Sequence, residues 1–116
     1  MKYTRWSIWL ATLDPVVGSE QGKTRPVIII SEDRINELLS VVNVLPVSSF
    51  KAGKAVYPNE TLLPKNRFGL KKESVVLCYQ IRTVDKKRLK KHYGQVDDES
   101  LQEEIIKALS FQLGIE

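Results

Sequence analysis

The 116-residue sequence contains one histidine, one cysteine and one methionine, and it has no long apolar run. A single histidine excludes an acid–base pair of two imidazoles within one chain, and a single cysteine excludes an internal disulfide. Together they are too few for a zinc cluster. Because no apolar run approaches about 18 residues and the N-terminus lacks a secretory pattern, we expect no membrane span and a cytoplasmic location.

Three motifs of phosphate and metal chemistry are also absent. The sequence has no GxxxxGK[ST] loop, no HExxH motif and no tight carboxylate cluster for two metal ions. Any phosphodiester cleavage by this chain must then proceed with no metal and no other cofactor. RNA permits this, because its 2′-oxygen lies beside the scissile phosphorus, so that positioning and charge stabilisation can supply most of the acceleration.

The length predicts one domain over residues 1–116, and 42% hydrophobic with 28% charged residues is typical of a globular chain. Its charge is unevenly distributed. Between Lys51 and Lys91 there are twelve Lys or Arg against three acids, whereas residues 97–116 contain six acids and one Lys. This asymmetry fits two solvated faces and a patch for a polyanion about equally well.

Short β-branched and aromatic runs predict strands over 5–13, 25–31, 41–47, 74–78, 81–84 and 92–96, with an edge strand over 54–57. The alternation in the first strand places Ile8 and Leu10 on one face and Trp9 and Ala11 on the other, with Trp9 in the core. Cys78 follows two apolar residues and is expected to be a small core residue rather than a nucleophile. His92, beside two lysines, is expected at the surface.

The helical pattern predicts a short helix over 32–39 capped by Ser31, a turn over 85–89, and a terminal helix. The terminal helix begins at Asp97 or Asp98 and ends at Gly114. Its apolar stripe comprises Leu101, Ile105, Ala108, Leu109 and Gln112, and leaves Ile106 and Phe111 exposed or at a partner surface. Many short strands with one terminal helix predict a small, strongly bent antiparallel barrel.

The polar segment between the first two predicted strands, within LATLDPVVGSEQGKTRPVIII at 10–30, is the candidate site. Two glycines permit unusual backbone angles, so its polar side chains can converge on one ligand. Pro26 biases Arg25 towards an extended conformation, and an arginine fixed at a strand entrance is a charged fork suited to phosphate. A loop arginine is more often a solvated charge, and composition alone favours that interpretation.

DPVVGSEQGKTRPVIIIS at 14–31 resembles the signature of the MazF/PemK family of toxin endoribonucleases, with GSEQ and RPV in the family's order and spacing. PVSS at 46–49 and QIRTVDKKRL at 80–89 extend the resemblance over nearly the whole chain. It implies a mainly β fold with a C-terminal helix, an SH3-like antiparallel barrel that is usually a homodimer. It also implies a bacterial type II toxin that cleaves single-stranded RNA at specific sequences and is inhibited by a cognate antitoxin.

The resemblance assigns two catalytic residues. Arg25 matches the arginine of the RPV motif and would hold the non-bridging phosphate oxygens and take part in proton transfer. Ser48 matches the hydroxyl residue after the family's Pro-x pair and would donate a hydrogen bond to the same phosphate, giving 2′,3′-cyclic phosphate and 5′-hydroxyl products. Since arginine has a pKa above about 12 and is a poor base, we add Glu20 as the candidate base or as the group that orients Arg25.

Ser19, Gln21 and Gln80 are candidate readers of base edges, although hydrogen bonding to the loop backbone explains each almost as well. Arg82 and Lys86 are candidates for flanking phosphates, with solvated charge as an equal alternative. The chain has Trp6-Ser7 where many family members have Gly-Asp, Ser48 where many have Thr, and Tyr79 where an acid is common. The tyrosine leaves base preference open.

Two other functions remain open at this point. A gyrase poison of the same fold would be a protein-binding toxin without catalysis, and it would not need Arg25 and Ser48 together. A non-catalytic RNA-binding module is the other alternative.

Overall fold

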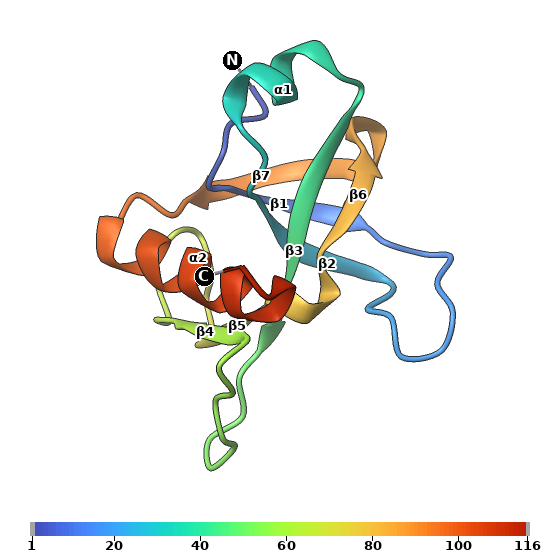
Figure 1. Cartoon of the computed structure of the whole chain (residues 1–116). Helices are drawn as coiled ribbons and strands as arrows, with labels where there is room; N and C mark the ends of the chain where they lie inside the picture. Colours follow the sequence, from blue (N-terminus) through green and yellow to red (C-terminus); the bar gives the residue numbers. More distant parts are fainter. Residues whose placement is uncertain (1, 116) are drawn as a thin grey trace.

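The computed structural model describes residues 2–115 and shows a mainly β fold with a C-terminal helix lying across the sheet (Figure 1). The predicted fold class is therefore confirmed. The strands are β1 (Ser7–Thr12), β2 (Thr24–Ile29), β3 (Val41–Ser49), β4 (Glu60–Leu63), β5 (Ser74–Leu77), β6 (Arg82–Asp85) and β7 (Leu89–Gln95). The helices are α1 (Asp33–Leu38) and α2 (Glu99–Leu113), with single 3₁₀ turns η1 (Cys78–Gln80) and η2 (Lys86–Arg88).

All strand pairs are antiparallel, in the order β4-β5-β3-β2-β1-β7, and β6 also pairs with β3. The nine-residue β3 is central: Val41–Val44 pair with β6, Val44–Pro46 with β2, and Val47–Ser49 with β5. One long strand that changes partners bends the sheet strongly, as predicted. The barrel is nevertheless open, because β4 and β7 form two unpaired edges within residues 2–115.

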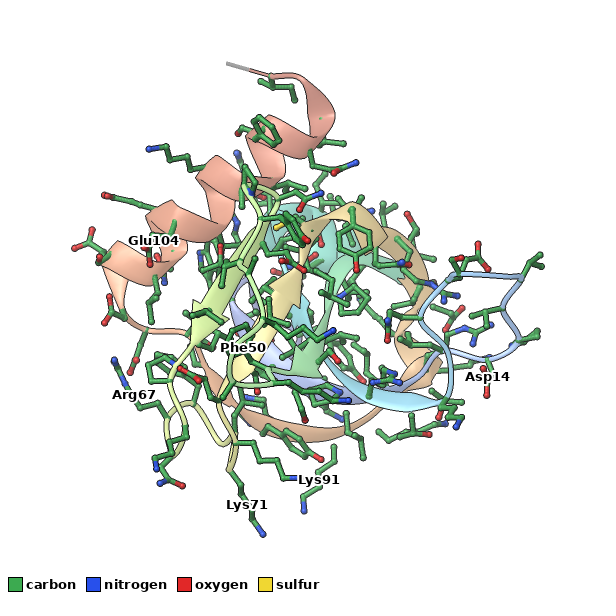
Figure 2. All side chains as sticks on the ribbon, turned by 90° about the horizontal axis from the view of Figure 1, so that it is seen from below. Asp14, Phe50, Arg67, Lys71, Lys91 and Glu104 are labelled. Carbon is green, nitrogen blue, oxygen red and sulfur yellow. The ribbon has the colours of Figure 1, made fainter. Side chains whose placement is uncertain are left out.

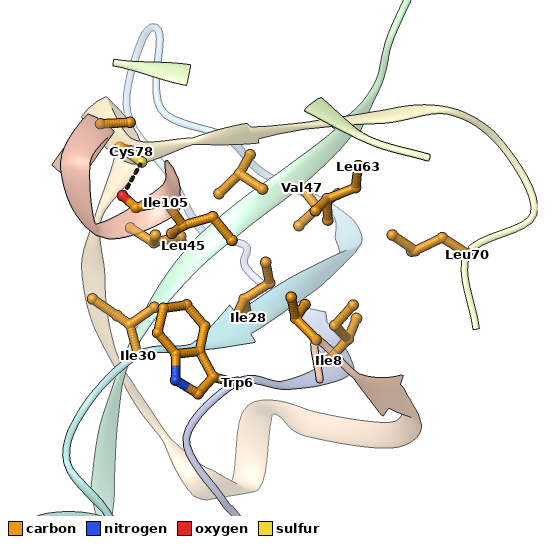
Figure 3. Packing of buried hydrophobic residues seen from close by; sticks show 13 residues of the cluster. Trp6, Ile8, Ile28, Ile30, Leu45, Val47, Leu63, Leu70, Cys78 and Ile105 are labelled. Atoms are coloured by element: carbon orange, nitrogen blue, oxygen red, sulfur yellow. Dashed lines mark hydrogen bonds between the residues drawn. The ribbon is translucent and has the colours of Figure 1, made fainter. Parts of the chain in front are cut away.

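The period of two along the strands builds a separate apolar cluster on each face of the sheet. One cluster contains Ile8 and Ile28 and is covered by α2 through Ile105 and Ala108 (Figure 3). The other contains Trp9, Ala11, Val27, Ile29, Val42 and Val44. The predicted alternation in β1 and the core position of Trp9 are thus confirmed. Cys78 is fully buried in the first cluster, where its thiol donates weakly to the Ile105 carbonyl at 3.9 Å.

Helix α2 begins and ends as its sequence predicts. The Asp98 carboxylate caps it by accepting from the Leu101 amide at 3.2 Å, and Gly114 ends it with φ +70°. The bond from Leu101, more than the neighbouring Arg67, holds the pKa of Asp98 below its usual value. Phe111 is exposed, as expected. Ile106 is half-buried and packs against the first cluster, so the exposed alternative is wrong for it, while a partner surface stays a prediction.

Two local predictions are also wrong. Residues 54–57 form no strand, and the strand in this region is β4, where Thr61 and Leu63 point into the core. Because β4 has only four residues and lies between Pro58 and Pro64, its alternation is too short to be recognised as a strand in the sequence. The cap of α1 is Glu32, which accepts from the Arg34 amide, while the Ser31 hydroxyl bonds Asn36 and the Asn43 amide instead.

Candidate functional site

The loop between β1 and β2 has a defined internal shape. At its base the Leu13 amide donates to the Lys23 carbonyl at 2.7 Å, and the Lys23 amide donates to Asp14 Oδ1 at 2.8 Å. Near its tip the Val17 amide donates to Glu20 Oε1 at 2.6 Å. Figure 2 shows this loop, marked by Asp14, projecting from the side of the molecule. The loop therefore presents a structured edge rather than an open chain.

Side chains from residues 80–88 hold the loop from the adjacent side. Arg82 Nη1 donates to the Leu13 carbonyl at 3.1 Å. Arg88 Nη1 donates to the carbonyls of Thr12 at 3.0 Å and Asp14 at 2.6 Å. These residues lie roughly 70 positions from their partners, so only the tertiary fold shows the contact. Arg88 was not among the predicted site residues, and its place in the QIRTVDKKRL block was the only signal available.

Gln80 also binds this loop. Its Nε2 donates to the Ser19 carbonyl at 3.1 Å, and its Oε1 accepts from the Gln21 amide at 3.2 Å. The backbone-binding alternative for Gln80 is therefore what the structure shows. Ser19 itself is exposed at the loop tip. Gln21 Oε1 is buried and accepts no hydrogen bond within residues 2–115, so a ligand reaches this acceptor only if the loop around it moves.

Arg25 and Ser48 lie at the same end of adjacent strands. The pair Val27–Pro46 ends the β2–β3 ladder, and Arg25 and Ser48 each lie two positions beyond it along their strands. Arg25 is half-buried, and its Nε donates to the Gly22 carbonyl at 3.1 Å. Its terminal nitrogens and Ser48 Oγ form no hydrogen bond within the described chain. The guanidinium fork and the hydroxyl thus keep donors that no group among the described residues uses.

Glu20 and Lys86 are not brought to this pair. The Glu20 carboxylate bonds the Val17 amide, and no contact joins it to Arg25 among residues 2–115. The Lys86 amide donates to the Ser40 carbonyl, next to the start of β3, whereas Ser48 is near the other end of that strand. Lys86 Nζ lies 5.6 Å from the centre of the Tyr3 ring.

The two other reactive side chains, Cys78 and His92, lie in the core and at the surface, respectively. Burial, and to a lesser extent the Glu60 charge, raises the pKa of Cys78 to about 12, so its thiol stays protonated and is a poor nucleophile. His92 is exposed, as predicted, with its ring 5.2 Å from the Trp9 ring. Over residues 2–115 no group of three or more His, Cys, Asp or Glu side chains could hold a metal ion. No helix in that range is both long and apolar enough to span a bilayer.

The chain resembles known proteins in both sequence and fold. The profile of the PemK-like, MazF-like toxins of type II toxin–antitoxin systems matches residues 4–113. The chain belongs to this family. An Endoribonuclease MazF from Staphylococcus saprophyticus is 39% identical over 111 residues, which cover 96% of this chain and 91% of that protein.

Solved structures of MazF proteins share the fold. MazF from Deinococcus radiodurans has a TM-score of 0.81 at 26% identity, with 97% of this chain and 96% of that chain covered. An endoribonuclease from a mycobacterial species, solved with its cognate antitoxin, has a TM-score of 0.79 at 18% identity, with 97% and 96% covered. The latter likeness shows the fold alone.

Within the MazF/PemK fold, the three sequence blocks that carry the family resemblance meet in space. Residues 14–31 supply the loop and Arg25, residues 46–49 supply Ser48, and residues 80–89 supply the side chains that hold the loop. Many family members have glycine where this chain has Trp6, and Trp6 adopts φ +74°, a conformation that favours glycine. The departure at Trp6 therefore keeps the backbone geometry of a glycine position.

Proposed function

We propose that this protein is the toxin of a bacterial type II toxin–antitoxin system and a metal-independent endoribonuclease that cleaves single-stranded RNA at specific sequences in the cytoplasm. The proposal is carried by the position of Arg25 and Ser48, two residues beyond the last β2–β3 pair, and by the absence of hydrogen bonds from the Arg25 terminal nitrogens within residues 2–115. Membership of the MazF/PemK family and 39% identity to an Endoribonuclease MazF support it.

The chemistry requires no nucleophile from the protein. The RNA 2′-oxygen attacks the adjacent phosphorus and the bond to the 5′-oxygen breaks, giving a 2′,3′-cyclic phosphate and a 5′-hydroxyl. Arg25 stabilises the charge on the non-bridging oxygens and supplies a proton towards the leaving oxygen, while Ser48 donates to the same phosphate. Glu20 is our candidate to accept the 2′-hydroxyl proton. The Val17 amide engages only its Oε1, so Oε2 is the oxygen that would take the proton.

Substrate recognition is proposed for the loop and the residues that hold it. Gln21 Oε1 can accept from a base N–H once movement of the loop exposes it, and the exposed Ser19 hydroxyl can bond a base edge. Gln80 acts mainly by fixing the loop, and Arg82 keeps donors free beyond its bond to Leu13 for a flanking phosphate. For Lys86, binding of a flanking phosphate stays a prediction, and it would apply to RNA that extends along β3 to the end opposite Ser48.

Two protein partners belong to the proposal. A cognate antitoxin would place a segment in the RNA cleft, and a second copy of the chain would form a homodimer. Exposed apolar side chains near the end of α2 offer a surface for such contacts, and they include Tyr57, Tyr79, Phe111, Leu113 and Ile115.

One experiment separates the three candidate functions. The purified protein is incubated with a mixed-sequence single-stranded RNA in EDTA, and the ends of the products are analysed. We expect cleavage at a short sequence motif, with 2′,3′-cyclic phosphate and 5′-hydroxyl ends. A gyrase poison would leave the RNA intact and block DNA supercoiling by gyrase. An RNA-binding module would shift the RNA in a gel without cutting it.

Arg88→Ala is expected to slow cleavage about tenfold or more while the fold remains. Arg88 bonds the carbonyl of Thr12 at the end of β1 and that of Asp14 at the start of the loop, and hydrogen bonds from a charged group contribute roughly 1.5–3 kcal/mol each. Hydrogen exchange should become faster at the loop amides of Gln21 and Lys23. Arg34→Ala is the matched control, because Arg34 is exposed and within residues 2–115 its side chain pairs only with Glu32. Unchanged exchange in the loop would show that Arg88 does not hold it.

A further inference from the structure

A basic hollow lies beside the Arg25–Ser48 pair and is not used by the chemistry described above. It has a volume of about 580 Å³, and its lining includes Pro26 of β2, Ser49 of β3, Lys91 and His92 of β7, and Lys71 and Lys72 from the segment before β5. Pro26 and Ser49 directly follow Arg25 and Ser48 in the chain. Since successive strand side chains point to opposite faces, the hollow opens on the other side of the strand ends from the catalytic pair.

The hollow is positively charged and has no carboxylate in its lining. Lys71, Lys72 and Lys91 are all exposed, and none of them forms a salt bridge within residues 2–115. Figure 2 shows Lys71 and Lys91 extending on the same side of the molecule. Three lysines without acidic partners around one concavity attract a polyanion. Part of the positive charge of residues 51–91 is therefore gathered around this hollow.

The segment that carries Lys71 and Lys72 is fixed against β7. A Cβ on Gly69, which has φ +83°, would lie 2.1 Å from the Tyr93 carbonyl oxygen, so only glycine permits this approach. Leu70 is buried in the core, and the Ser74 hydroxyl donates to the Lys72 carbonyl at 2.9 Å. The lysine backbones are therefore held in a set arrangement, which reduces the entropy lost when they bind a ligand.

We infer that this hollow binds the backbone phosphates of single-stranded RNA next to the scissile linkage. The inference rests on the proposed endoribonuclease function. RNA whose scissile phosphate lies at Arg25 and Ser48 can pass around the ends of β2 and β3 and reach Pro26 and Ser49 within one residue of the pair. Lysine ammonium groups bind phosphates without reading bases, so the hollow adds affinity and sets the position of the strand, while the loop reads sequence.

The test measures RNA binding across a salt series by fluorescence anisotropy. The probes are a 2′-deoxy-substituted, non-cleavable oligonucleotide that extends beyond the cleavage site, and a short one that covers the site only. The variant is Lys71→Gln/Lys91→Gln. Lys90→Gln/Lys107→Gln is its control, because it removes the same charge from exposed lysines that do not line the hollow.

We expect the hollow variant to lower the salt slope for the long oligonucleotide by about 1.4, at about 0.7 for each of two phosphate contacts. The short oligonucleotide and the control variant should show the wild-type slope, and cleavage of short RNA should proceed at the wild-type rate. An equal slope in both variants would overturn the inference even if the wild type cleaves RNA. Absence of wild-type cleavage would instead contradict the proposed function.

An acidic protein segment is the competing ligand for the same lysines. A poly-glutamate peptide serves as its probe in the same anisotropy assay. If Lys71→Gln/Lys91→Gln abolishes peptide binding but keeps the wild-type salt slope for long RNA, the hollow is a protein-binding surface and the RNA assignment is wrong.

Discussion

Arg25→Ala is expected to abolish RNA cleavage and leave the protein folded. Arg25 supplies a charged fork to the phosphate, and removal of one preorganised donor alone typically slows catalysis by about 10² to 10³-fold. Loss of a full charge with two terminal donors should exceed that. Stability should change little, because the one side-chain bond that Arg25 makes within the described chain is to the Gly22 carbonyl, and it belongs to neither apolar cluster.

The measurement is the cleavage rate of a fluorogenic single-stranded RNA, together with thermal unfolding of each variant. Arg25→Lys keeps the charge but not the planar fork, so its rate should fall between those of the wild type and the alanine variant. Near-normal turnover by Arg25→Ala would remove the proposed mechanism. A large fall in the unfolding temperature would mean that the lost rate reports folding instead.

Ser48→Ala should slow cleavage strongly, by about 10² to 10³-fold, whereas Ser48→Thr should keep most of it. Ser48 lies two residues beyond the last β2–β3 pair, at the strand ends where Arg25 also lies, and no protein group engages its hydroxyl among residues 2–115. Threonine retains a donor at the same carbon, as many MazF/PemK members do at this position. Its β-branched side chain also suits a strand.

The neighbouring serine provides the control for this prediction. Ser49 alternates to the other face of β3 and lines the basic hollow, so Ser49→Ala should affect cleavage of a short RNA little. If Ser48→Ala keeps full activity and Ser49→Ala does not, the two hydroxyls have exchanged the roles assigned to them. If both variants are fully active, a backbone amide supplies the contact to the phosphate.

The family resemblance in the sequence named Arg25 and Ser48, but it did not show how the residues around them act. Gln80 and Arg82 were predicted as ligands of RNA, and the structure shows them bonded to the loop backbone. Lys86 was grouped with them because it lies in the same sequence block, yet it lies near the opposite end of β3 from Ser48. Residues that are close in one sequence block need not face the same site, because the chain turns at η2 directly after β6.

What the sequence determined by itself is local. The alternation in β1, the cap at Asp98, the stop at Gly114 and the buried Cys78 each depend on a residue and a few neighbours, so they could be predicted from pattern alone. The tertiary structure alone decided that the sheet stays open, that Arg88 holds the β1–β2 loop, and that lysines from distant segments meet in one hollow. These features depend on which strands pair and in which register, and contacts between residues tens of positions apart leave no periodic signal in one sequence.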